Sequence, residues 1–270
     1  MMDIEVAQST NMGRVRDHNE DAIGSWIPDS RARKRSHGWL LALADGVGGH
    51  DFGEVASALA IETLIAEFPK AAPNSPLASL LPDLIRLANT RIVERAADVK
   101  GKGLSMCTTV VACALRYDQA VIAHAGDSRC YRIRPAKLPA LAEIIVLTRD
   151  HTAANEQSLM AIDPELNKHI LTRSLGKEMF ISPDVVTSPI EPDDLLLLCS
   201  DGLHGALSDR RIAAIATQSL PLAEIARQLT DEATEADGGD NATVFLARIK
   251  KIERIGMYRG RPYRLQERQP

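Results

Sequence analysis

The sequence predicts an α+β protein in which helices pack onto largely antiparallel sheets. Two observations lead to this class. Strand-like runs come in clusters, and helical patterns come in pairs between those clusters. Several of the strand-like runs are continuously apolar, as expected for strands whose faces are covered. The chain has 270 residues, which allows one large domain with a substantial core.

The individual elements follow from short apolar runs and from helical periodicity. The expected strands, in chain order, cover residues 5–10, 22–27, 38–44, 108–115, 119–125, 128–134, 143–147, 194–200 and 243–249. The expected helices cover residues 54–68, 77–99 and 212–235. Pro221 should split the last helix, because proline lacks an N–H and clashes with the preceding turn.

Three segments lie outside these elements. Residues 151–181 are polar and irregular, and we expect them to form a flap over one end of the sheets. Residues 28–37 are rich in proline and basic side chains and predict a solvated loop, with a docking surface for an acidic or phosphorylated partner as the alternative. Residues 250–270 hold seven Lys or Arg and two Glu. We expect a domain over residues 1–249 and a basic tail, mobile or packed on the back of the domain.

Composition narrows the class of protein. The net charge is −4, which gives no reason to expect nucleic-acid binding. The longest apolar runs hold about six residues, far fewer than the ~20 that span a bilayer, and the N-terminus lacks the features of a signal peptide. The four cysteines form no C-x-x-C pair and predict buried thiols in a reducing cytoplasm. Monomeric behaviour is expected.

Acidic residues gather at the ends of strands or in tight turns. The four clusters are residues 16–21, 45–50, 201–202 and 237–241. Taken singly, the first reads as a charged hairpin loop, the second as a glycine-rich turn that opens a helix, and the others as ordinary turns. Taken together, they place carboxylates where these would repel one another without a cation. Carboxylate oxygens on a rigid sheet suit Mg²⁺ or Mn²⁺. Two such ions can clamp a phosphoryl group and activate a bridging water for in-line attack, with Arg16 as a candidate phosphate ligand.

Six ordered motifs carry a resemblance to a known family. They are Arg16-x-x-x-Glu20-Asp21, Asp45-Gly46-Val47-Gly48-Gly49-His50, Ala125-Gly126-Asp127-Ser128-Arg129, Asp150-His151, Ser200-Asp201-Gly202-Leu203 and Asp240-Asn241-Ala242-Thr243. In this order and spacing they resemble the PPM/PP2C family of metal-dependent serine/threonine protein phosphatases, in its bacterial form. The match covers residues 5–249.

The resemblance implies a fold, a reaction and a set of ligands. The fold would be a four-layer α-β-β-α sandwich with two central antiparallel sheets. Phosphoserine and phosphothreonine in proteins would be hydrolysed by direct attack of water activated between two Mn²⁺ or Mg²⁺ ions. Metal ligands would be Asp45, the carbonyl of Gly46, Asp201, Asp240 and Glu20 or Asp21, with Asp127 helping Asp201 to bind a third, weaker ion. Arg16 would bind phosphate, and the partners would be a Ser/Thr kinase and its substrates.

Some positions depart from the family pattern. Cys107 stands where many members have glycine, which should alter strand packing and leave the metal site intact. Val47 stands where some members carry a histidine proposed as general acid. His50 lies three residues further on, so it is either the acid or a structural histidine. We expect His151 to cap or pack at the start of the flap, His18 to be exposed, and His124 to be a satisfied core residue.

Other functions remain to be weighed. A cysteine-nucleophile phosphatase is excluded, because no cysteine has an arginine six positions later. A catalytically silent PP2C-like regulatory binding module would lack metal ligands, yet Asp45, Asp201 and Asp240 are present. A phosphatase of a regulatory switch protein usually carries a sensor domain, for which this chain has no room. A nucleic-acid role would rest only on the basic loop and tail.

Overall fold

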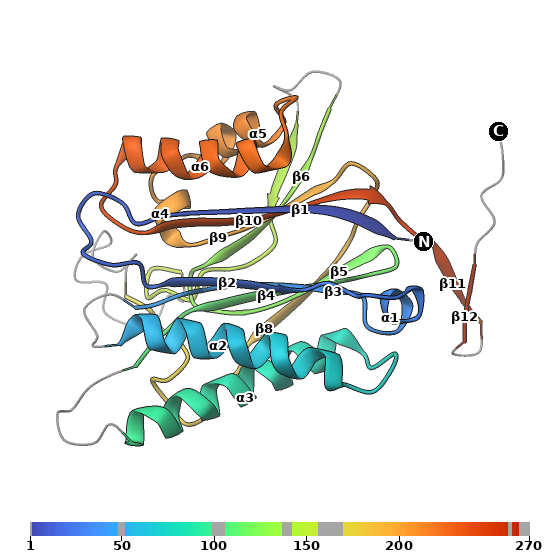
Figure 1. Cartoon of the computed structure of the whole chain (residues 1–270), viewed down its shortest axis with the longest axis horizontal. Coiled ribbons are helices and arrows are strands. Elements are labelled where there is room, and N and C mark those ends of the chain that lie inside the picture. The colour runs from blue at the N-terminus through green and yellow to red at the C-terminus, as the bar shows by residue number, and fades with distance from the viewer. Residues whose placement is uncertain are drawn as a thin grey trace.

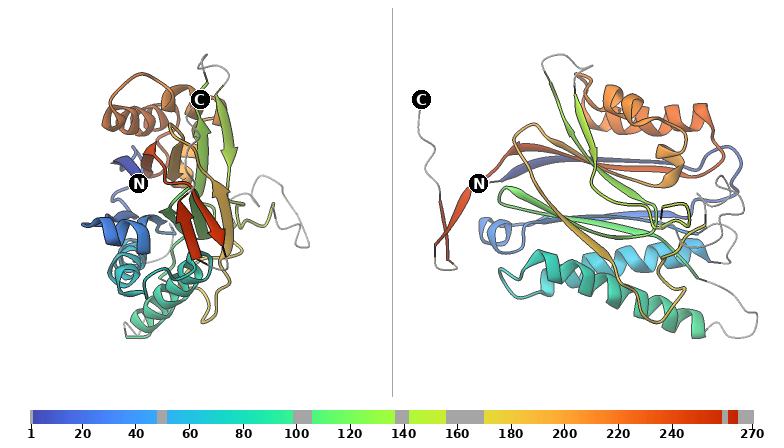
Figure 2. Two further views of the ribbon diagram at one scale, coloured as in Figure 1. Left: turned by 90° about the vertical axis from the view of Figure 1, so that its right-hand side faces the viewer. Right: turned by 180° about the vertical axis from the view of Figure 1, so that it is seen from behind.

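The computed structural model contains two five-stranded antiparallel sheets that stack face to face, with helices on both outer faces (Figures 1 and 2). The structure describes residues 2–47, 52–98, 106–136, 142–155, 170–258 and 261–264, and for residues 255–264 it describes the backbone alone. This arrangement is the four-layer α-β-β-α sandwich that the resemblance implies.

The first sheet has the strand order β1-β10-β9-β6-β7. Its strands are β1 (Asp3–Asn11), β10 (Ala242–Lys251), β9 (Leu195–Cys199), β6 (Arg129–Arg134) and β7 (Glu143–Val146). The helices α4 (Asp201–His204), α5 (Asp209–Ala216) and α6 (Leu222–Ala236) lie on its outer side. The break between α5 and α6 confirms the expected split at Pro221.

The second sheet has the strand order β2-β3-β4-β5-β8. Its strands are β2 (Asp21–Trp26), β3 (Trp39–Asp45), β4 (Val110–Arg116), β5 (Gln119–Ala125) and β8 (Asp184–Pro189). Its outer face is covered by α2 (Gly53–Glu67), which continues into the short 3₁₀ helix η1 (Phe68–Lys70), and by α3 (Leu77–Asp98). Strand β8 was not among the expected strands, because its residues are mostly exposed or half-buried at the sheet edge.

Three apolar layers hold the sandwich together. One lies between the second sheet and α2–α3, one between the first sheet and α4–α6, and one between the two sheets. The layer between the sheets takes the alternate side chains of β3, β4, β9 and β10, which explains why these strands are continuously apolar in sequence. The two sheets therefore form a rigid frame for the loops at their ends.

The basic segment before β3 is helical, so the prediction of a loop over residues 28–37 is wrong at α1 (Arg31–Ser36). The Ser30 hydroxyl accepts a hydrogen bond from the Arg33 N–H and caps the helix. Arg35 forms a two-bond ion pair with Glu253, which follows β10. The arginine therefore has a structural partner on the segment that leaves the sandwich.

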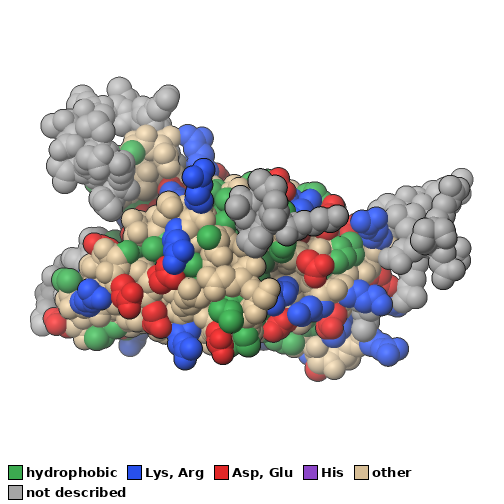
Figure 3. Space-filling model, turned by 90° about the horizontal axis from the view of Figure 1, so that it is seen from above, with side chains coloured by type: hydrophobic (Ala, Val, Ile, Leu, Met, Phe, Trp, Pro, Cys, Tyr) green, Lys and Arg blue, Asp and Glu red, His purple; other side chains and the backbone are tan. Residues whose placement is uncertain are grey.

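The chain after β10 forms a hairpin of β11 (Ile255–Tyr258) and β12 (Arg261–Arg264), which projects from the sandwich (Figures 1 and 2). On the face seen from above α5 and α6, acidic and basic side chains are interspersed (Figure 3). Among the described residues, no helix is long and apolar enough to cross a membrane.

Candidate metal centre

Five aspartates converge where the two sheets meet at one end of the sandwich. Asp21 begins β2 and pairs in register with Asp45 at the end of β3. Asp201 opens α4 directly after β9, and Asp240 lies in the turn before β10. Asp127 lies in the turn from β5 to β6, which connects one sheet to the other. The sequence separates these acids, and the antiparallel pairing brings them together.

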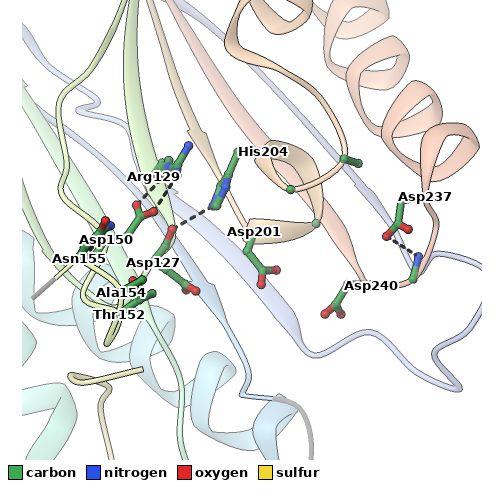
Figure 4. Close-up of a pocket in the computed structure, with 14 residues that line it drawn as sticks. Asp127, Arg129, Asp150, Thr152, Ala154, Asn155, Asp201, His204, Asp237 and Asp240 are labelled. Carbon is green, nitrogen blue, oxygen red and sulfur yellow. Dashed lines mark hydrogen bonds and ion pairs between the residues drawn. The ribbon is translucent and has the colours of Figure 1, made fainter. Parts of the chain in front are cut away.

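Two adjoining cavities open onto this cluster. The smaller one, of about 210 Å³, is lined by Arg16, Asp45, Gly46, Val47, Thr109, Asp127, Leu171, Asp201 and Asp240. The larger one, of about 770 Å³, shares Asp127, Asp201 and Asp240 with it. Figure 4 shows these three side chains projecting into the larger cavity from the β5–β6 turn, from α4 and from the turn before β10. A ligand in either cavity would therefore meet the same carboxylates.

Burial and mutual repulsion raise the pKa values of three of the aspartates. Burial raises the pKa of Asp45 well above its usual value, and the charges of Asp21 and Asp201 raise it further. Burial raises the pKa of Asp21 to about 7, with a contribution from Asp201. The pKa of Asp127 also rises to about 7 through burial and the charge of Asp201. Both causes disfavour the ionised carboxylates.

A divalent cation fits this donor set. Asp21 is half-buried, and its Oδ1 atom is shielded from solvent and receives no hydrogen bond within the described part of the chain. An unpaired buried carboxylate oxygen is costly, and a cation offsets that cost. The side chains lining the smaller cavity that could bind a cation, those of Asp45, Thr109, Asp127, Asp201 and Asp240, all offer oxygen, which suits Mg²⁺ or Mn²⁺ rather than a soft metal.

Hydrogen bonds from both sheets hold the carboxylates in place. The Ser200 hydroxyl accepts from the Thr243 N–H at 3.0 Å and donates to Asp21 Oδ2 at 2.8 Å. The Asp45 N–H donates to the Thr109 hydroxyl at 3.1 Å, which leaves that hydroxyl free to donate to Ser128 at 2.7 Å. Ser128 follows Asp127, so the second chain of bonds connects two of the acidic turns.

Arg16 lies at the rim of the cluster. Its Nη2 atom donates to Asp240 Oδ2 at 2.6 Å, and both side chains are about one-third exposed. A guanidinium has five N–H donors in a fixed plane. Arg16 can therefore hold Asp240 and still present donors to an anion in the smaller cavity.

The structure separates Glu20 from Asp21. The Glu20 carboxylate lies beside Gly53 at the start of α2, and its Oε1 is 3.1 Å from His18 Nε2. The Glu20 carbonyl accepts the Gly46 N–H at 3.1 Å. Asp21 thus belongs to the carboxylate cluster, whereas Glu20 stands behind it and supports Gly46. His18 is mostly exposed, as expected.

His50, the expected acid candidate, lies outside the described residues, as do Gly48 and Gly49. Val47, just before them, lines the smaller cavity.

Sequence reasoning missed His204. This side chain is half-buried, and its desolvation lowers its pKa to about 4. Its Nε2 atom lies 3.1 Å from the carbonyl oxygen of Asp127. His204 thereby connects α4, which carries Asp201, to the turn that carries Asp127. The signal was present in the sequence, because His204 follows Asp201 by three residues and three-residue spacing places side chains on one face of a helical turn.

Comparison with known proteins agrees with this geometry. The family model for protein phosphatase 2C matches residues 14–238. Protein phosphatase PhpP of Streptococcus pneumoniae is 31% identical over 256 residues, which is 92% of this chain and 98% of PhpP. Serine/threonine phosphatase Stp1 from Staphylococcus aureus has a crystal structure that superposes with a TM-score of 0.78 at 30% identity, covering 92% of this chain and 96% of that one.

A further solved structure concerns the metal. The catalytic domain of the serine/threonine protein phosphatase PstP, in complex with two manganese ions, superposes with a TM-score of 0.73 at 31% identity and covers 93% of this chain and 100% of that one. These matches confirm the resemblance that the six motifs indicate. The chain belongs to the protein phosphatase 2C family.

Proposed function

We propose that this chain hydrolyses phosphoserine and phosphothreonine in proteins, in a reaction that requires Mn²⁺ or Mg²⁺. The observation that carries the proposal is the convergence of four aspartates beside Arg16 in a cavity of about 210 Å³, with a fifth, Asp21, paired in register with Asp45. Membership of the protein phosphatase 2C family supports the same reaction.

The aspartates divide into groups that would hold the cations. Asp45 is central, because the charges of Asp21, Asp201, Asp127 and Asp240 all act on it. We assign Asp45 to both ions, the Gly46 carbonyl to one of them, Asp201 and Asp240 to the other, and Asp127 with Asp201 to a weaker third. When bound, Mn²⁺ or Mg²⁺ neutralises phosphate charge and makes water an effective nucleophile at neutral pH.

The remaining steps fall to side chains of this chain. Arg16 donates N–H groups to the non-bridging phosphate oxygens and so orients phosphorus for attack by water from the side opposite the leaving group. The phosphorus–oxygen bond to the serine or threonine breaks, and the departing oxygen takes up a proton. His50 is the candidate for the proton donor, with a structural role as the alternative. The four cysteines are buried, so a phosphocysteine intermediate has no accessible nucleophile.

The partners, the oligomeric state and the cellular location belong to the same proposal. The substrate class fits a Ser/Thr kinase and its targets as partners. We also propose a monomer in the cytoplasm, whose reducing conditions suit four buried cysteine thiols.

The test is hydrolysis of p-nitrophenyl phosphate and of a phosphothreonine peptide with Mn²⁺, with Mg²⁺ or with EDTA. We expect activity with either metal and none in EDTA. Asp45→Ala and Asp201→Ala should abolish it, whereas Asp83→Ala, at an exposed acid on α3 that pairs with Arg86, should not. Full activity in EDTA, or in both cluster variants, would refute the proposal. A folded protein that binds Mn²⁺ and a phosphopeptide without hydrolysis would instead indicate a binding module.

A further inference from the structure

His151, the first residue of the predicted flap, makes two hydrogen bonds with Gly126, the residue before Asp127. The Gly126 N–H donates to His151 Nδ1 at 3.2 Å, and the His151 N–H donates to the Gly126 carbonyl at 3.0 Å. Gly126 has a φ of +111°, and a Cβ there would lie 2.6 Å from the Thr109 side chain. The turn therefore has a backbone shape that depends on glycine and on an external partner.

The hydrogen bond to Nδ1 fixes the tautomer of His151. A neutral imidazole carries one proton, so a ring that accepts at Nδ1 has its proton on Nε2. His151 Nε2 lies 3.2 Å from Asp184 Oδ2, and Asp184 Oδ1 accepts from Arg173 at 2.6 Å. Asp184 begins the edge strand β8, and Arg173 lies near the end of the flap. One ring thus joins the Asp127 turn to the edge strand.

The imidazole of His124 stacks on one face of the His151 ring. The two imidazoles stack with centroids 4.7 Å apart and planes 16° apart, and both side chains are buried. Nδ1 of His124 has no partner within the described part of the chain, so the expectation of a satisfied core histidine is wrong. His151 packs at the start of the flap, as expected.

These three side chains place ligand atoms within 4.8 Å of one another, yet the bonding excludes a metal on His151. A neutral histidine that ligates through Nε2 keeps its proton on Nδ1. Here the Gly126 N–H points at Nδ1, and two donors cannot share that position. His151 therefore acts through its hydrogen bond with Gly126, and its Nε2 lies close to Asp184 without hydrogen-bond geometry.

Asp127 lacks the side-chain support that two of the other acids have. Within the described part of the chain, its carboxylate accepts no hydrogen bond from a neighbouring side chain, whereas Asp21 and Asp240 each accept one. Its position therefore depends on the backbone of its own turn. That backbone is held at Gly126 by His151 and at the Asp127 carbonyl by His204.

We propose that His151 is a positioning residue for the weakest of the metal sites, because it fixes the Gly126–Asp127 backbone through its Nδ1 acceptor. The inference rests on the proposed function, in which Asp127 is a metal ligand. His151, at the start of the predicted flap, is then one of the residues that support that metal site.

Two substitutions test the two sides of the His151 imidazole separately, the Nδ1 side and the side that faces Asp184. His151→Asn keeps a side-chain acceptor near the place of Nδ1 and loses the reach to Asp184. His151→Gln reaches toward Asp184 and leaves the Gly126 N–H without an acceptor. Mn²⁺ binding is measured without substrate by titration calorimetry, together with thermal unfolding in EDTA.

We expect His151→Gln to weaken the weakest Mn²⁺ site by about 10-fold or more, as is typical for residues that orient a ligand, and to leave the tighter sites unchanged. His151→Asn should stay within about 3-fold of the wild type, since it keeps the acceptor. His37→Gln is the matched control. His37 is a buried histidine that lies before β3, at the end opposite Asp45, and its two ring nitrogens contact Ser36 and Ala71.

The comparison with Asp127→Ala makes the inference specific. In that background His151→Gln should cause no further loss of Mn²⁺ affinity. Equal weakening of all sites by both variants, or an unchanged weakest site in His151→Gln, would overturn the inference. If His151→Gln does not fold, His151→Ala, which also leaves the Gly126 N–H without its acceptor, replaces it, with selective weakening of the same site as the expected result and no weakening as the overturning one. Hydrolysis by the wild type is scored separately, so loss of the proposed function would leave this binding result interpretable.

Discussion

Gly46 offers a direct test of how closely α2 is packed against the metal centre. A Cβ at this position would lie 2.6 Å from the carbonyl carbon of Gly53, 2.7 Å from the Gly53 oxygen and 2.8 Å from the Glu20 Cβ. Ordinary contact begins at 3.4 Å, and two of these atoms are backbone. In Gly46→Ala, the start of α2 and the Asp45–Gly46 segment must therefore separate by about 0.8 Å.

The size of the effect follows from that displacement. Overpacking of this kind costs about 1–3 kcal/mol of unfolding free energy. A misplacement of about 1 Å lowers the rate of an enzyme by about 100-fold. We therefore expect kcat/KM to fall between about 10- and 100-fold, although the Gly46 carbonyl itself is retained. The apparent Mn²⁺ requirement should rise as well.

The assay is phosphothreonine-peptide hydrolysis over a Mn²⁺ titration, with thermal unfolding of the metal-free protein. Gly24→Ala is the matched control, because Gly24 lies in the neighbouring strand β2 and also faces α2. Its Cβ would lie 2.5 Å from a methyl group of Ile61, a side chain that can move. That variant should lose stability and keep its Mn²⁺ dependence. A Gly46→Ala protein with normal kcat/KM and normal Mn²⁺ dependence would refute the reasoning.

Three further predictions concern buried polar groups. Ser200→Ala leaves Asp21 Oδ2 without its hydroxyl donor, so the metal-free protein should lose about 1–3 kcal/mol in chemical denaturation; unchanged stability would show that the bond contributes nothing. Arg129 holds Asp150 through two hydrogen bonds of 2.9 and 2.7 Å, which lysine cannot reproduce, so Arg129→Lys should lower the unfolding free energy by about 2 kcal/mol, and an equally stable variant would contradict this. Burial lowers the pKa of His124 to about 4 from 6.5. Its contribution to stability is therefore complete above pH 6.5 and is lost as the pH falls toward 4, so acidification to pH 5 should cost the wild type about 2 kcal/mol more than His124→Gln. If the unfolding free energies of the wild type and of His124→Gln fell equally with pH, the burial of His124 would be rejected as the cause.

The sequence was sufficient for most of the sandwich and for the expectation that the acids at strand ends lie close together. Strands such as β3 and β9 are continuously apolar because both faces are buried, and this pattern can be recognised in the sequence alone. Strand β8 was missed for the opposite reason, since an edge strand with exposed side chains has no apolar signature. Helix α1 was hidden because its basic residues bury no side chain, and only the cap at Ser30 marks its start.

The site was predictable at the level of residues and unpredictable at the level of contacts. An Asp-Gly at the end of a buried strand can be read from the chain, so Asp45 and Asp201 were found. The distinction between Glu20 and Asp21 depends on the direction of each side chain where the chain enters β2, since Asp21 is the first residue of that strand and Glu20 lies just before it. His204 and His151 act through the backbone of residues distant in sequence, and no local pattern encodes such a contact.

The origin of the five aspartates explains why a cation suits this place. Asp21 and Asp45 belong to one sheet, Asp201 and Asp240 to strand ends of the other, and Asp127 to the turn that crosses between them. Without a cation, the apolar layer between the sheets must hold together strands whose ends repel each other electrostatically. Side-chain bonds such as Ser200 to Asp21 cross the same gap. A cation shared by both sheets would replace repulsion with attraction at the junction, so metal binding and sheet-to-sheet packing stabilise each other. The catalytic ions are thus expected to serve as structural links as well.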